Sequence, residues 1–130
     1  MNAREATLAG THTLIDFWHC RECSRDEWES LLESVVEAAG VQLLELRIKE
    51  FQPQGLTAFC LLSESHLSVH TWPENDYVGI DLFTCGMHCQ PERAIEILTE
   101  FLRPQSSQIQ TLQRGCKPSV NPLVGSTQDG

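Results

Sequence analysis

The sequence predicts an α+β domain, a two-layer sandwich in which two helices cover one face of a mainly antiparallel sheet. Apolar residues recur with helical spacing in two stretches. Shorter alternating or continuous apolar runs, bounded by turn residues, lie before, between and after these stretches. A chain of 130 residues that is 41% hydrophobic and 21% charged has the composition of an ordinary globular protein, which favours a single domain over residues 1–130.

The first strand and the first helix are expected near the N-terminus. The segment from His12 to Trp18 alternates and is rich in Thr, Ile, Phe and Trp, which is typical of a strand. Ser24 and Glu27 have the spacing of a capping box, and Gly40 is suited to end the helix that they begin. The apolar stripe of this helix consists of Trp28, Leu31, Leu32, Val35, Val36 and Ala39.

Four further strands are expected between the two helices. Pro53-Gln54-Gly55 and the run that begins at Pro73 supply turns between them. These strands are Val41 to Phe51, Leu56 to Leu62, Leu67 to Trp72 and Tyr77 to Thr84.

The last helix, the last strand and a tail follow. Pro91 suits the first turn of a helix, and Pro104 stops it. Ser107 to Leu112 is expected to be a strand, and residues 116–130, rich in Pro, Gly, Ser, Asn and Gln, are expected to form a flexible tail. The apolar stripe of this helix consists of Ala94, Ile95, Leu98, Phe101 and Leu102.

The charge and composition exclude several classes of protein. With 9 basic and 18 acidic residues the formal charge is -9, which disfavours a nucleic-acid partner. No stretch approaches the roughly 18 to 20 apolar residues of a membrane span, and the N-terminal residues contain no apolar signal core. We therefore expect a cytoplasmic protein without a membrane partner, whose six cysteines are thiols and not disulfides.

A dense polar cluster lies between Ser63 and Cys85, much of it within sequence that resembles strands. Buried polar groups cost about 1 to 3 kcal/mol each unless they are paired. The cluster therefore indicates either a functional site or the wet face of a half-exposed strand. Its members are Ser63, Glu64, Ser65, His66, Ser68, His70, Thr71, Glu74, Asp76, Asp81 and Cys85.

Three motifs within this cluster decide between these readings. They are Glu64-Ser65-His66, the run HTWPE from His70 to Glu74, and the run FTCG from Phe83 to Gly86. Together they resemble the signature of prokaryotic S-adenosylmethionine decarboxylase, a small pyruvoyl enzyme that makes the aminopropyl donor for spermidine and other polyamines. The similarity extends to His12 through Cys20, to the run FQPQG from Phe51 to Gly55, and to Arg114-Gly115.

The resemblance implies a proenzyme that cleaves itself between Glu64 and Ser65 into residues 1–64, the beta chain, and residues 65–130, the alpha chain. The Ser65 hydroxyl would attack the preceding carbonyl and convert the amide into an ester. Elimination and loss of ammonia would then leave an N-terminal pyruvoyl group. This group forms a Schiff base with the substrate amine and serves as an electron sink. The resemblance implies no pyridoxal phosphate and no metal.

By the same resemblance, three residues support the chemistry at Ser65. His70 would remove the serine α-proton during cleavage, which suits an imidazole that titrates near neutrality. Cys85 would return a proton to the substrate α-carbon, because a thiol with a pKa of about 8.5 is mostly protonated at neutral pH. Thr57 keeps the hydroxyl of a serine that the family usually has at this position, and would assist cleavage.

The resemblance also implies four substrate-binding residues. Phe51 and Trp72 would enclose the adenine, Glu74 would accept a hydrogen bond from a ribose hydroxyl, and Asp16 would attract a sulfonium or an amine. The alternative is that the aromatic residues belong to the core and that Glu74 is a turn residue. Lys49 departs from the family, which usually has a histidine there. An arginine or ornithine decarboxylase on the same scaffold therefore remains an alternative.

The spacing between Ser65 and His70 raises a geometric question. In a straight strand, residues five apart lie on opposite faces and about 17 Å from one another. Either the chain turns sharply just after the cleavage site, or the site combines residues brought together by the wider fold or a second protomer. Two helices on one face of a sheet also leave the other face uncovered, so we expect a homodimer.

Two other classes of function compete with the decarboxylase. His19-Cys20 with Cys23, and Cys85 with His88-Cys89, have spacings that a tetrahedral zinc site can use. This zinc-binding module would leave the motifs around Ser65 unexplained. A catalytically inactive homologue is the other rival, and the presence of Ser65, His70 and Cys85 argues against it.

Overall fold

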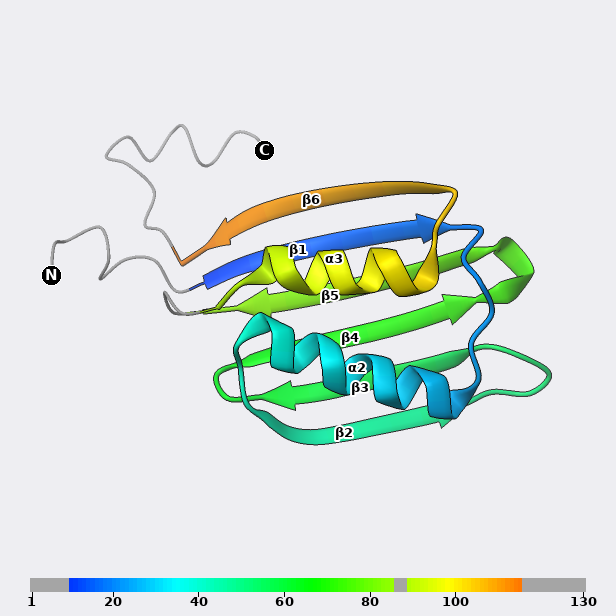
Figure 1. The fold of residues 1–130 in the computed structure, drawn as a ribbon, viewed down its shortest axis with the longest axis horizontal. Coiled ribbons are helices and arrows are strands. Elements are labelled where there is room, and N and C mark those ends of the chain that lie inside the picture. Colours follow the sequence, from blue (N-terminus) through cyan, green and yellow to red (C-terminus); the bar gives the residue numbers. More distant parts are fainter. Residues whose placement is uncertain (1–9, 86–88, 116–130) are drawn as a thin grey trace, which may run out of the picture.

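The computed structural model describes residues 10–85 and 89–115, which form a six-stranded antiparallel sheet with two helices on one face (Figure 1). The predicted α+β fold class is therefore confirmed. The predicted tail over residues 116–130, together with Gly86 and His88, lies outside the described residues. The elements are β1 (Gly10–Trp18), α2 (Arg25–Ala39), β2 (Leu43–Glu50), β3 (Leu56–Leu62), β4 (Ser65–Trp72), the short 3-10 helix η1 (Pro73–Asn75), β5 (Tyr77–Thr84), α3 (Pro91–Leu102) and β6 (Ser106–Arg114).

The sheet places strands from the two halves of the sequence side by side. The strand order is β2-β3-β4-β5-β1-β6, so β1 lies between β5 and β6 (Figure 1). Every neighbouring pair is antiparallel. None of the helices in the described residues is long and apolar enough to cross a membrane.

The capping residues of α2 lie where the sequence predicts them. The Ser24 hydroxyl accepts a hydrogen bond from the backbone N–H of Glu27 at 3.1 Å, and the Glu27 carboxylate accepts one from the N–H of Ser24 at 2.9 Å. Gly40 ends the helix in the left-handed conformation, with φ of 80°. A side chain at this φ would be strained, which accounts for the glycine.

The boundaries of four strands differ from the prediction. β1 begins at Gly10 and β6 spans Ser106–Arg114, because these two strands pair with one another over this whole length. β2 is shorter than Val41 to Phe51 because the amides at both ends are engaged elsewhere. The N–H of Val41 bonds the carbonyl of Val36 at the end of α2, and the N–H of Phe51 bonds the carbonyl of Gly55 across a turn. β4 begins at Ser65, two residues before the predicted start, because its first residues pair with the end of β3.

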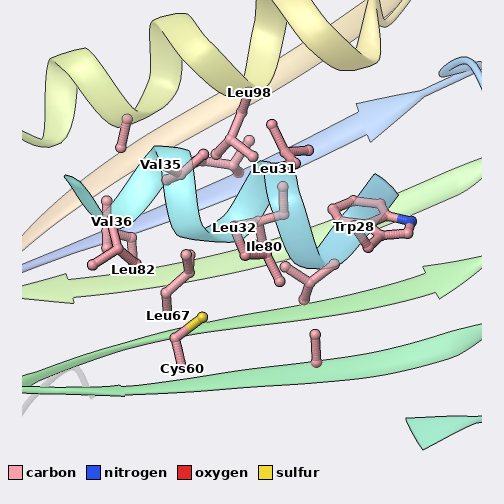
Figure 2. Close-up of a cluster of buried hydrophobic side chains, with 14 of the residues drawn as sticks. Trp28, Leu31, Leu32, Val35, Val36, Cys60, Leu67, Ile80, Leu82 and Leu98 are labelled. Atoms are coloured by element: carbon pink, nitrogen blue, oxygen red, sulfur yellow. The ribbon is translucent and has the colours of Figure 1, made fainter. Parts of the chain in front are cut away.

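The hydrophobic core fills the layer between the helices and the sheet. Figure 2 shows Leu32 and Val35 of α2 above Leu67 and Ile80 of the sheet, with Leu98 reaching toward them from α3. All five side chains are at most 2% exposed. Burial alternates along β1, β3, β4 and β5, as expected for strands with one covered face.

The opposite side of the sheet carries no helix in the described part of the chain, and we call it the open face. On the four central strands its residues are those that alternate with the core residues. They are His12, Leu14, Asp16 and Trp18 of β1, Thr57, Phe59 and Leu61 of β3, His66, Ser68, His70 and Trp72 of β4, and Tyr77, Gly79, Asp81 and Phe83 of β5.

Leu98→Ala should lower the free energy of unfolding by about 2 to 5 kcal/mol, because Leu98 is fully buried and its truncation leaves a cavity. Urea denaturation of an uncleaved Ser65→Ala background measures the change. Leu44→Ala is the control, since Leu44 is 55% exposed and its truncation should cost less than about 0.5 kcal/mol. An equal loss in both variants would contradict this account of the core.

Candidate active site

The Glu64-Ser65 bond lies at the turn between β3 and β4. Only Ser63 and Glu64 separate the two strands, and Ser65 already pairs with Leu62. Glu64 has a φ of 63°, the left-handed region, which costs a residue with a side chain about 1 to 2 kcal/mol. Ser65 itself is buried, at 7% exposure. A strained residue therefore precedes a buried serine at this end of the sheet.

Cys85, the residue after β5, contacts both groups at this bond. Its Sγ donates a hydrogen bond to the carbonyl oxygen of Glu64 at 2.7 Å and lies 3.8 Å from the Ser65 hydroxyl. The Cys89 thiol in turn donates to the carbonyl of Cys85 at 2.8 Å. Burial raises the pKa of Cys89, so it stays a protonated donor. The structure thus brings together Glu64 and Ser65, the predicted cleavage site, and Cys85, one of the three predicted catalytic residues.

His70 does not join this group within the chain. β4 runs without interruption from Ser65 to Trp72 and is paired along this length with β3 and β5. Burial places Ser65 on the covered face with Leu67, whereas His70 lies on the open face. The two residues are five positions apart, which is about 17 Å along a strand. The sharp turn comes before the cleavage site and not after it.

His70 belongs to a row of side chains that crosses the open face. The hydroxyl of Thr57 lies 3.1 Å from His70 Nδ1, so these two predicted residues are in contact. When Nδ1 donates this hydrogen bond, Nε2 carries the free lone pair and can accept a proton. The register of the sheet gives the whole row as Lys49, Thr57, His70, Gly79, Asp16 and Gln108.

The other predicted binding residues lie at the same end of the sheet as this row. Trp72, which is 41% exposed, ends β4, and Glu74 lies in η1 directly after it. Phe51 is 47% exposed and lines a cavity of about 400 Å³ between the β1–α2 and β2–β3 loops. Neither aromatic residue belongs to the core. Lys49 stands opposite Thr57, near these residues.

The predicted site residues therefore form two groups at opposite ends of the sheet. In Figure 1 the β3–β4 turn lies at the left end, and the β2–β3 loop and η1 lie at the right. We call Glu64, Ser65 and Cys85 the cleavage group. We call the second set the binding group, which consists of Asp16, Phe51, Thr57, His70, Trp72 and Glu74.

The same separation contradicts a single zinc site built from both cysteine motifs. Cys20 follows the end of β1, and Cys85 follows the end of its antiparallel neighbour β5. Cys20 and Cys85 are therefore separated by the length of a nine-residue strand, about 30 Å. Among residues 10–85 and 89–115, no three His, Cys, Asp or Glu side chains are placed to hold a metal ion.

Comparison with known proteins decides the family. The family model described as S-adenosylmethionine decarboxylase matches residues 11–115. The chain belongs to the S-adenosylmethionine decarboxylase family. An S-adenosylmethionine decarboxylase proenzyme of Methanococcus maripaludis is 38% identical over 109 residues, which cover 82% of this chain and 89% of the relative. A proenzyme of the same name from Parasynechococcus marenigrum is 38% identical over 120 residues, covering 90% and 94%.

A solved structure supports the same assignment. The crystal structure of the adenosylmethionine decarboxylase from Aquifex aeolicus aligns with a TM-score of 0.75 and 29% identity, over 88% of this chain and 98% of that one. The chain is thus a member of a family of carboxy-lyases, and it has the sandwich fold of a solved decarboxylase.

Sequence reasoning did not identify two contacts at these groups. Cys89 supports Cys85, and Tyr77 donates a hydrogen bond to Asp16 on the open face. Tyr77 also stacks on Trp72 with ring centroids 5.5 Å apart. The alternation along β5 does place Tyr77 on the same face as Asp81, but it does not show that Asp16 on β1 is the residue that Tyr77 contacts.

Proposed function

We propose that this member of the S-adenosylmethionine decarboxylase family decarboxylates S-adenosylmethionine with a pyruvoyl group that it makes from its own Ser65. The contact of the Cys85 thiol with both the Glu64 carbonyl and the Ser65 hydroxyl is the observation that carries this proposal. The names of the relatives support the substrate. Decarboxylation of arginine or ornithine is the alternative, and CO2 release measured with each of the three substrates tests it. A cytoplasmic location stays a prediction.

Cleavage requires an attack on the carbonyl that Cys85 contacts. The Ser65 oxygen adds to the Glu64 carbonyl carbon, the C–N bond breaks, and the acyl group moves from nitrogen to oxygen. Negative charge develops on the carbonyl oxygen, where the thiol of Cys85 donates its hydrogen bond. Removal of the Ser65 α-proton then expels the Glu64 carboxylate, and addition of water with loss of ammonia leaves the pyruvoyl group.

The pyruvoyl group supplies an electron-withdrawing carbonyl for decarboxylation. Cys85 is close enough to the same centre to return a proton to the substrate carbon. For the reaction to occur, the binding group has to lie next to the pyruvoyl group made from Ser65. Phe51 and Trp72 would hold the adenine, Glu74 a ribose hydroxyl, and Asp16 the positive charge of the sulfonium.

The separation of the two groups within one chain supports a homodimer. If the open faces of two copies pack together about a two-fold axis that lies between them and perpendicular to the strands, the cleavage end of each sheet meets the binding end of the other, and the dimer has two complete sites. The open face carries exposed apolar side chains that such contact would cover, among them Phe59 at 41% and Leu61 at 43% exposure. In this arrangement His70 of the partner subunit meets the backbone of Ser65 at the end of the sheet and serves as the base for its α-proton.

An intact mass spectrum under denaturing conditions tests the cleavage. The wild-type chain should give two species, residues 1–64 and residues 65–130, the second lighter by the change from serine to pyruvoyl. Ser65→Ala should give one uncut, inactive chain, because the nucleophile is gone. Ser63→Ala, the neighbouring serine, is the matched control and should cut normally. Two fragments from Ser65→Ala would exclude Ser65 as the nucleophile.

Cys85→Ala should slow cleavage by about 10²-fold, the usual cost of losing one donor to a developing oxyanion. The time course of fragment formation in freshly translated protein measures this rate. Cys85→Ser should recover much of it, since a hydroxyl also donates. Cys23→Ala, at the other end of the sheet, is the control and should cut at the wild-type rate. Unchanged cleavage in Cys85→Ala would remove the thiol from this step.

Co-expression of Ser65→Ala and His70→Ala chains tests the shared site. Each mixed dimer contains one site with an intact cleavage group from one chain and an intact binding group from the other. We expect decarboxylation to return, although each variant alone is inactive. Ser65→Ala with Cys85→Ala is the matched control, because both residues belong to the cleavage group and no mixed site is intact. Mixed dimers without activity in the first pair would contradict the shared site.

A further inference from the structure

Tyr77 connects two members of the binding group across three strands. Its hydroxyl donates a hydrogen bond to the carboxylate of Asp16 on β1. Its ring stacks on Trp72 of β4 at 5.5 Å with an interplanar angle of 23°. Trp72 in turn packs on His70, with ring centroids 5.6 Å apart. A substitution at Tyr77 is therefore expected to alter the positions of the Asp16 carboxylate, the Trp72 indole and the His70 imidazole.

Gly79 provides the space that this arrangement needs. Asp16 and Gly79 are direct partners in the β1–β5 register, and Tyr77 precedes Gly79 on the same face. A Cβ atom at position 79 would lie 2.8 Å from the Tyr77 hydroxyl and 3.3 Å from the ring carbon that bears it. Any side chain there would displace the hydroxyl. The side chain of Tyr77 thus lies over Gly79, and its hydroxyl extends past Gly79 to Asp16.

Trp18 holds the Tyr77 ring from the other side. Trp18 is the register partner of Tyr77, and their ring centroids lie 5.6 Å apart. Tyr77 is therefore packed between two indoles, which leaves its ring few alternative rotamers. A hydrogen bond from a ring fixed in this way holds the Asp16 carboxylate in one orientation.

We propose that Tyr77 is a positioning residue of the binding group, whose hydroxyl fixes the Asp16 carboxylate and whose ring fixes Trp72 beside His70. This inference rests on the proposed function, because it assigns Tyr77 a part in binding the same substrate. Tyr77 touches neither Ser65 nor Cys85, and Tyr77→Phe keeps the ring that packs on Trp72 beside His70, so loss of the hydroxyl should leave cleavage unchanged. Its contribution should appear in substrate binding and not in the maturation of the chain.

The ionisation of Tyr77 is consistent with this role. Burial, the hydrogen bond to Asp16 and the negative charges of Asp16 and Asp81 raise the pKa of Tyr77 to about 12. The hydroxyl therefore remains a donor throughout the neutral range. Because Tyr77 is the one tyrosine in the sequence, tyrosinate absorbance reports on this residue alone.

Steady-state kinetics of the cleaved Tyr77→Phe enzyme with S-adenosylmethionine test the proposal. We expect KM to rise about tenfold, the usual effect of losing a hydrogen bond to a charged group, with a smaller change in kcat. Gly79→Ala should give the same pattern, because it displaces the hydroxyl while Tyr77 and Asp16 both remain. Fragment masses should match those of the wild type in both variants.

A double-mutant cycle separates positioning from a structural role. If Tyr77 acts through Asp16, adding Tyr77→Phe to Asp16→Asn should raise KM no further. Asp81→Asn is the matched control, since it removes a charge from the same face without removing the hydrogen bond, and its KM should stay within about twofold. Additive effects of Tyr77→Phe and Asp16→Asn on KM would overturn the proposal.

Tyrosinate titration keeps this test distinct from the test of the proposed function. Asp16→Asn should lower the titration midpoint of Tyr77 toward its ordinary value, and more than Asp81→Asn does. If the midpoint does not move, the positioning contact is absent and the proposal fails, whether or not the enzyme is active. If it moves but the wild-type chain neither cuts nor binds S-adenosylmethionine, the proposed function fails, and with it the role of Tyr77 in binding.

Discussion

The unbroken pairing of β4 is the constraint on which the arrangement of the site depends. A pleated strand alternates its side chains and rises by a constant step. Because β3 and β5 pair with β4 along its length, the segment from Ser65 to Trp72 cannot bend between its functional residues. Ser65 and His70 are therefore directed to opposite faces and held apart. The sheet that gives the chain its stability also prevents one chain from bringing its own proposed catalytic residues together.

The fold was largely predictable from the sequence because local patterns determine it. The helical stripe from Trp28 to Ala39 and the alternation from Tyr77 to Thr84 each report one buried face, and both segments have the predicted bounds. The predicted strand boundaries are wrong where a backbone N–H can donate its hydrogen bond either to a neighbouring strand or to another acceptor. The amides of Val41 and Phe51 bond a helix end and a turn, and hydropathy carries no information about that choice.

The site was predictable only as a set of residues. The motifs name Ser65, His70 and Cys85, but the contacts join positions far apart in the sequence. Cys85 meets a carbonyl 21 residues away, and Tyr77 bonds a carboxylate 61 residues away. Such contacts follow from the register of paired strands and from the space left by Gly79. The hydrophobic pattern of a single strand does not show which residues of the neighbouring strand lie opposite it. The location of the cleavage group and the binding group at opposite ends of the sheet could therefore be seen only in the structure.

The position of β1 has a consequence for the cleavage that we propose. Residues 1–64 contribute β1, α2, β2 and β3, and residues 65–130 contribute β4, β5, α3 and β6. After such a cut, three of the five strand pairings, β3 with β4, β1 with β5 and β1 with β6, would join different polypeptides. The two fragments would be interleaved and not merely adjacent. Their separation would be equivalent to unfolding, and the mature protein would gain stability from protein concentration as a heterodimer does.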